Sequence, residues 1–177
     1  SGFSTPQGLD YLLELFEYVA SDNELSSNRW SSYVQQGGRF YINDKELTYS
    51  IGFRSQYWSM NREFFVSPRL RFSYKPKWMK DFLFRVALGS YNQSPFYREL
   101  RDKKGTLYTN LKSQKSTHFV FSADYNFISW NRPFKFLGEI YFKDLKDIIP
   151  YEIENLRIRY LPELSSTGYT TGIDLRV

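Results

Sequence analysis

The stretch FVFSADYNFISWNRPFKFLGEIYFK, residues 119–143, carries the pattern that decides the fold. Large apolar side chains occupy nearly every second position on both sides of the central SWNR segment. Each half therefore has one apolar face and one polar face, as does an antiparallel strand that buries a single face. The stretch predicts two strands, at 119–127 and 134–143, joined by a tight turn.

The same two-residue period recurs along the chain. It is clear at 47–56, 64–75, 82–89 and 169–177, and less regular at 29–41. Together with the first two, these segments predict seven strands and an all-β fold. Only residues 9–20 have apolar side chains spaced for one face of a short helix.

Composition narrows the function classes. Of the 177 residues, 20% are aromatic, which argues against disorder, and the absence of cysteine excludes disulfide frameworks and thiolate metal sites. Twenty-four basic residues stand against nineteen acidic ones, and the basic residues are spread over all the predicted strands rather than clustered. We therefore expect no nucleic-acid partner.

The connections between the predicted strands differ in length. NDKE (43–46), PKWMK (76–80) and SWNR (129–132) are short, whereas YWSMNRE (57–63) and the segments after the fourth and sixth strands are longer. In an up-and-down sheet this alternation puts the short turns at one end and the long loops at the other, as in transmembrane barrels. Regular strands of about 10–11 residues also match a tilted membrane crossing. The alternative is a β-sandwich with aromatic side chains between its sheets.

Four separated sequence segments carry a family resemblance: VSPRLRFSYKP (66–76), GSYNQSPFYRELRD (89–102), RPFKFLGEIYFKDLKDIIPYEIENLRIRY (132–160) and GYTTGIDLRV (168–177). Together they resemble the barrel of TonB-dependent outer-membrane receptors, most closely those of Bacteroides-group bacteria. The resemblance implies that residues 29–177 are an antiparallel, up-and-down section of a transmembrane β-barrel in a Gram-negative outer membrane. It also implies short periplasmic turns and long extracellular loops, with 1–28 an extracellular segment containing the short helix. The family barrel has about twenty-two strands, so the chain looks like an internal section without its plug domain.

The resemblance implies part of a transporter that binds a ligand at the cell surface and imports it with inner-membrane energy. The implied partners are the chain's own plug domain and remaining barrel, the TonB complex through that plug, and outer-membrane lipid. The resemblance does not decide whether a surface lipoprotein covers the pore. It also leaves four ligand classes: iron chelate, cobalamin, glycan or peptide. No cofactor is expected. The alternative is a binding or structural outer-membrane barrel, such as an adhesin, that transports nothing.

Two sets of candidate site residues follow. Residues 91 to about 115 are expected to form an extracellular loop whose aromatic and charged side chains suit ligand capture. The loop candidates are Tyr91, Asn92, Gln93, Phe96, Tyr97, Arg98, Glu99 and Arg101. Alternatively, this stretch is an architectural clasp that packs against neighbouring loops or the plug. The residues expected to face the lumen and the plug are Arg54, Arg69, Arg71, Arg85, Asp124, Glu139, Asp174 and Arg176.

Catalysis and metal binding have little support in the sequence. His118 is the only histidine, and although Ser116 and Asp124 lie near it, no GxSxG motif accompanies them. The acidic segment 144–155 lacks the ligand spacing of a calcium loop. We therefore expect neither an enzyme nor a metal site.

Overall fold

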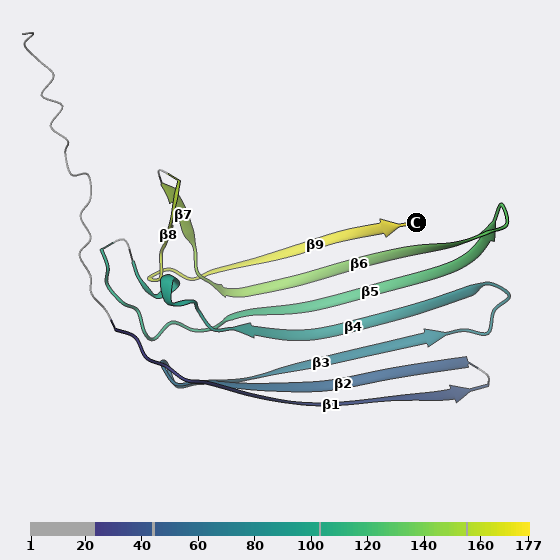
Figure 1. Cartoon of the computed structure of the whole chain (residues 1–177), viewed down its shortest axis with the longest axis horizontal. Helices are drawn as coiled ribbons and strands as arrows, with labels where there is room; N and C mark the ends of the chain where they lie inside the picture. The colour runs from purple at the N-terminus through teal and green to yellow at the C-terminus, as the bar shows by residue number, and fades with distance from the viewer. Residues whose placement is uncertain (1–23, 44, 103, 155) are drawn as a thin grey trace, which may run out of the picture.

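The computed structural model describes residues 24–43, 45–102, 104–154 and 156–177, most of which lie in β-strands (Figure 1). The strands are β1 (Arg29–Ile42), β2 (Lys45–Trp58), β3 (Glu63–Lys75), β4 (Asp81–Gln93), β5 (Gln114–Ser129), β6 (Arg132–Ile148), β7 (Tyr151–Glu154), β8 (Arg157–Tyr160) and β9 (Ser166–Arg176). Within the described ranges the one helix is the 3-10 turn η1 (Tyr97–Leu100). The helix expected at 9–20 lies outside the described residues.

Seven strands form one antiparallel sheet in the order β1-β2-β3-β4-β5-β6-β9. Neighbours in the sheet are neighbours in the chain, except that the separate β7–β8 hairpin is inserted between β6 and β9. The predicted all-β class and seven antiparallel strands are therefore confirmed. The sheet is open, with β1 and β9 as its edges in the described part of the chain (Figure 1).

Strand register sorts the side chains onto two faces. One unbroken row across six strands contains Tyr49, Phe72, Val86, Phe121, Ile140 and Ile173. We call this side the apolar face. Three residues along each strand, the opposite side carries a row of Gln35, Gly52, Arg69, Gly89, His118, Lys143 and Thr170. We call this side the polar face.

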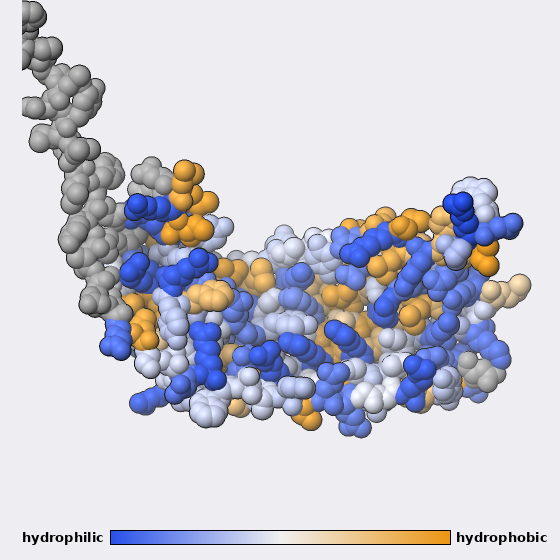
Figure 2. Space-filling view, in the orientation of Figure 1, coloured by the Kyte–Doolittle hydropathy of each residue, from blue (hydrophilic) through white to orange (hydrophobic). Residues whose placement is uncertain are grey.

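Within the described residues, no second layer covers the apolar face. Many of its side chains are exposed, including Phe64 at 65% and Ile173 at 71%. The buried hydrophobic side chains among the described residues are instead Trp58, Phe65, Leu100 and Ile149, in or beside the two long connections or on the polar face. Figure 2 shows hydrophilic side chains over much of the sheet face turned to the viewer, and hydrophobic ones gathered on the β7–β8 hairpin.

The connections divide between the two ends of the sheet, as predicted, but not strictly by length. The β5–β6 turn is Trp130–Asn131, whose φ angles of 50° and 54° match a two-residue type I′ hairpin. At the other end lie the connections 94–113 and 149–165, the second holding the β7–β8 hairpin (Figure 1). The long loop expected at 57–63 is wrong, because β2 continues to Trp58 and β3 begins at Glu63.

The loop expected at 91 to about 115 is also shorter than predicted. Tyr91, Asn92 and Gln93 belong to β4, and Gln114 and Lys115 to β5. The β4–β5 ladder continues through the pairs Tyr91↔Ser116, Asn92↔Lys115 and Gln93↔Gln114. Backbone hydrogen bonds extend the ladder where the apolar alternation that revealed the strands has already stopped.

Candidate functional site

The base of the loop 94–113 is fastened to the ends of β1 and β2. Trp58 is 1% exposed, and the Arg29 guanidinium lies over its ring, 5.0 Å from the centroid. Arg29 also donates a hydrogen bond from Nη2 to the carbonyl oxygen of Pro95, at 2.9 Å. The Tyr97 ring lies 6.0 Å from the same guanidinium. This cation–π and hydrogen-bonded group, which we call the loop clasp, holds the first part of the connection against the sheet.

Ser27 closes the loop clasp on its other side. The Trp58 indole donates from Nε1 to the Ser27 hydroxyl oxygen at 3.1 Å, and that oxygen lies 2.9 Å from the Tyr97 hydroxyl. The buried indole N–H therefore has the partner that an aromatic amphipathic side chain requires. Ser27, Arg29, Trp58, Pro95 and Tyr97 together constitute the loop clasp.

Glu63 fastens the far end of the same loop. Its Oε2 accepts hydrogen bonds from the Ser113 backbone N–H at 2.9 Å, from the Ser113 hydroxyl at 2.6 Å and from Asn61 Nδ2 at 3.0 Å. Asn61 Nδ2 also donates to the Leu111 carbonyl oxygen at 2.7 Å. The β3–β4 ladder ends at Arg69↔Gly89, so these bonds close the gap where the two strands diverge.

The predicted loop residues have different surroundings. Glu99 is buried and accepts the Phe96 backbone N–H at 2.8 Å, which caps η1. The Arg98 guanidinium lies 5.6 Å from the ring centroid of Tyr160 in β8, so the two long connections touch. Phe96 and Tyr97 remain about half exposed, while Arg101 forms a backbone bridge with Leu107. The clasp alternative thus gains support for Tyr97 and Glu99.

A tight turn shapes the exposed tip of this loop. The Asp102 carboxylate accepts the backbone N–H groups of Lys104 and Thr106, each at 2.8 Å. Partial removal from water opposes ionisation, but the N–H groups outweigh it and lower the pKa of Asp102 below its usual value. The negative charge therefore holds the turn closed.

The polar face has a compact ion cluster towards the short-turn end of β4, β5 and β6. Asp124 of β5 is 2% exposed and lies between Arg85 of β4 and Lys135 of β6, whose Nζ is 2.7 Å from Oδ2. All eight residues expected to face the lumen lie on the polar face: Arg54, Arg69, Arg71, Arg85, Asp124, Glu139, Asp174 and Arg176. The cluster joins three neighbouring strands through one carboxylate.

Two conservative substitutions on the polar face are expected to have opposite effects. Asp124→Asn removes a buried charge that two cations contact, and should lower the free energy of unfolding by about 1–3 kcal/mol. Asp174→Asn should raise it by about 0.2–1 kcal/mol, because Asp174 is directly opposite Glu139 and like charges repel. Denaturant titration of both variants in the same detergent measures the two changes. Equal losses would contradict the register.

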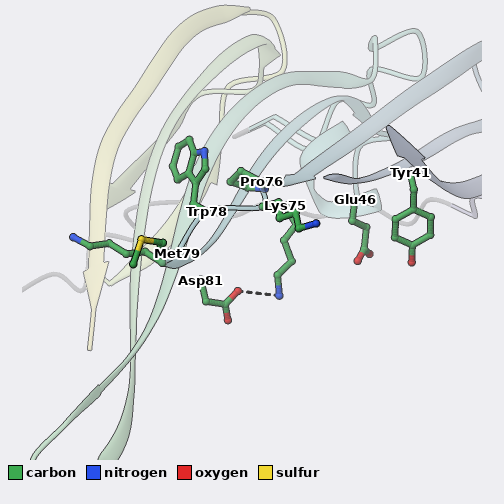
Figure 3. Close-up of a pocket in the computed structure, with 9 residues that line it drawn as sticks. Tyr41, Glu46, Lys75, Pro76, Trp78, Met79 and Asp81 are labelled. Atoms are coloured by element: carbon green, nitrogen blue, oxygen red, sulfur yellow. Dashed lines mark ion pairs between the residues drawn. The ribbon is translucent and has the colours of Figure 1, made fainter. Parts of the chain in front are cut away.

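A shallow pocket of about 380 Å³ lies at the short-turn end (Figure 3). Lys75 and Asp81 form an ion pair across it at 2.9 Å, and Glu46 pairs with Arg39 at 3.0 Å. Trp78 points away from these carboxylates and packs edge-on against Phe82 and Phe84 of the apolar face. The acids of the pocket are therefore occupied by cations, and Trp78 faces the other side of the sheet.

The geometry offers no catalytic or metal centre in the described residues. His118 contacts Ser116 at 2.6 Å and packs on the Tyr91 ring, with no hydrogen bond to a carboxylate. No three His, Cys, Asp or Glu side chains gather as a metal site within the described ranges. In those ranges, no helix has the length and apolar character of a membrane span.

Sequence reasoning missed the loop clasp. Arg29 and Trp58 are direct cross-strand partners at the end of the first hairpin, so the register would have brought them together. Glu63 and Ser113 gave no signal, because fifty residues separate them and neither belongs to an alternating pattern. Comparison with known proteins adds nothing here: no family model, curated protein or solved structure matches the chain.

Proposed function

We propose that the chain forms part of the wall of a TonB-dependent outer-membrane transporter, which binds a ligand at the cell surface and imports it with inner-membrane energy. The apolar face is the observation that supports this most strongly. It continues across six strands, and many of its side chains are exposed, with no second layer over them among the described residues. Lipid tails are the surroundings in which such a face is stable.

The two ends of the sheet support the same proposal. Trp78 and Trp130 are exposed at short turns and pack edge-on against phenylalanines of the apolar face, as interfacial aromatic residues do. The long connections gather at the opposite end, where a transporter exposes its loops to the outside. The polar face then lines the bore, and the loop clasp fixes the loop 94–113 at its mouth.

Cysteine labelling tests the orientation of the faces. The chain has no native cysteine, so Leu70→Cys on the apolar face and Arg71→Cys on the polar face introduce single thiols at adjacent positions of β3. In a cysteine-free version of the complete gene product in lipid vesicles, we expect a water-soluble maleimide to label position 71 at least about tenfold faster than position 70. Lipid exclusion of the reagent is the reason.

Position 70 should instead react with a membrane-soluble maleimide. Thr106→Cys in the exposed turn of the connecting loop serves as the control for full aqueous access. Equal labelling of positions 70 and 71 by the aqueous reagent would overturn the proposed orientation.

A second candidate function is a binding or structural barrel that moves no solute. The internal hydrogen bonds of Glu99 and Asp102 favour it, because these carboxylates are already committed within the loop. Genetic epistasis separates the two functions. For a transporter, deleting the gene in a strain that already lacks TonB adds no growth defect, whereas loss of a structural barrel adds its own defect.

A further inference from the structure

Charges on the polar face are segregated along the strands. Three adjacent cross-strand rows lie near the middle of β2 and β3: the central row contains Arg69, His118 and Lys143, and the flanking rows contain Arg54 and Arg71. None of these rows includes an aspartate or a glutamate. The next row towards the short turns mixes signs, with Glu139 and Asp174 in the same row as Arg39 and Arg85. We call the five basic residues of the first three rows the cationic belt.

Two charged members of the cationic belt, Arg69 and Lys143, lie against aromatic rings rather than acids. The Arg69 guanidinium lies 4.6 Å from the Tyr91 ring centroid, and Lys143 Nζ lies 5.1 Å from that of Tyr141. Among the described residues, Arg54, Arg69, Arg71 and Lys143 form no ion pair. Their positive charge is therefore not cancelled by the sheet itself.

Tyr91 organises the middle of the cationic belt. Its ring lies over Gly89, where an added Cβ would meet the ring at 2.8 Å, so a larger residue at 89 would displace it. On one side the ring carries Arg69, and on the other its centroid is 4.5 Å from that of His118. This stacking holds a guanidinium and an imidazole in one row.

We infer that the cationic belt binds a solute with two or more carboxylate or phosphate groups. Arginine presents paired donors that match the oxygens of these groups, and several uncancelled cations on one face of the sheet attract a multivalent anion over a distance. Beyond the belt, acidic and basic side chains share the cross-strand rows, so the uncancelled positive charge, and with it the binding position, lies at the belt itself. This inference names a substrate class for the proposed transporter, although the binding itself needs only the polar face.

Calorimetric titration tests the inference on the complete gene product in a non-ionic detergent at low salt. Pyrophosphate and citrate are the probes, and maltose is the uncharged comparison. Both anions should bind, with affinity that falls as sodium chloride is added, and maltose should not. In the double variant Arg69→Gln/Arg71→Gln, anion affinity should fall at least about tenfold.

Two further variants keep the result interpretable. Lys80→Gln/Arg132→Gln removes the same charge at the short-turn end and should leave affinity within about twofold. Ser50→Glu adds a carboxylate directly opposite Arg71 without removing a cation, and should weaken binding as the belt variant does. Equal affinity in the belt and control variants, or no anion binding by the unaltered protein, would overturn the inference.

An imidazole NMR signal provides a local readout. His118 is the only histidine of the chain, and its signal is identified by its loss in His118→Asn. Pyrophosphate should shift that signal in the unaltered protein and not in the belt variant. If the protein binds the anions but the aqueous maleimide labels positions 70 and 71 equally, the transporter proposal is rejected and the cationic belt stands as an anion site. If position 71 is labelled selectively but the anions do not bind, only the inference about the cationic belt is rejected.

Discussion

Replacing Ile51 with arginine is expected to lower the free energy of unfolding by about 2–4 kcal/mol when the protein is folded in a lipid bilayer. Ile51 lies at the middle of β2 on the apolar face, opposite Leu70, and 41% of it is exposed. If lipid covers that exposed part, the guanidinium must leave water at the depth where its transfer is most costly. If water covers it, the same substitution costs within about 0.5 kcal/mol.

The matched control is Gln35→Arg. Gln35 lies on the polar face of the adjoining strand, opposite Gly52, at the same level of the sheet. An arginine there reaches the water of the proposed bore, so the change in unfolding free energy should stay within about 0.5 kcal/mol. Urea titrations in phospholipid vesicles, followed by intrinsic fluorescence, measure both variants. A cost for Ile51→Arg no larger than that of the control would contradict a lipid-facing apolar face.

The sequence predicted the middle of the sheet well and its ends poorly. Alternation at 119–127 and 134–143 reports directly which side chains share a face, because the side-chain period of a strand is two. The strands nevertheless continue beyond those limits, to Gln114 and Ile148. There the ladder is held by backbone groups, and polar residues on both faces leave no periodic trace.

Apart from the cross-strand pair of Arg29 and Trp58, the contacts of the loop clasp gave no sequence signal, for a different reason. These contacts join side chains that are far apart in the chain, such as Arg29 and Pro95, and that depend on the register of several strands. Trp58 illustrates the error: the sequence placed it in the longer connection expected at 57–63. Instead it is on the polar face and fully covered, because the guanidinium of Arg29 and the hydroxyl of Ser27 surround it.

The same burial makes Trp58→Ala the substitution with the largest expected effect on the loop. Removing a buried aromatic ring costs about 3–5 kcal/mol, and here the loss falls on the contacts that fasten residues 94–113. Without the indole, Arg29 loses its stacking partner, and Ser27 loses the donor that fixes it beside Tyr97. We therefore expect the loop to detach while the sheet remains folded.

Limited trypsin digestion measures this detachment through cleavage after Arg101. The cleavage rate of folded protein should rise at least about a hundredfold in Trp58→Ala, because about 2.7 kcal/mol of lost closure already corresponds to that factor. Trp58→Phe keeps a ring under Arg29 but loses the indole donor, so its rate should rise only about tenfold. Trp130→Ala, at the exposed β5–β6 turn, should leave loop cleavage unchanged. A loop that stays equally resistant in Trp58→Ala would mean that the Glu63 contacts alone hold it.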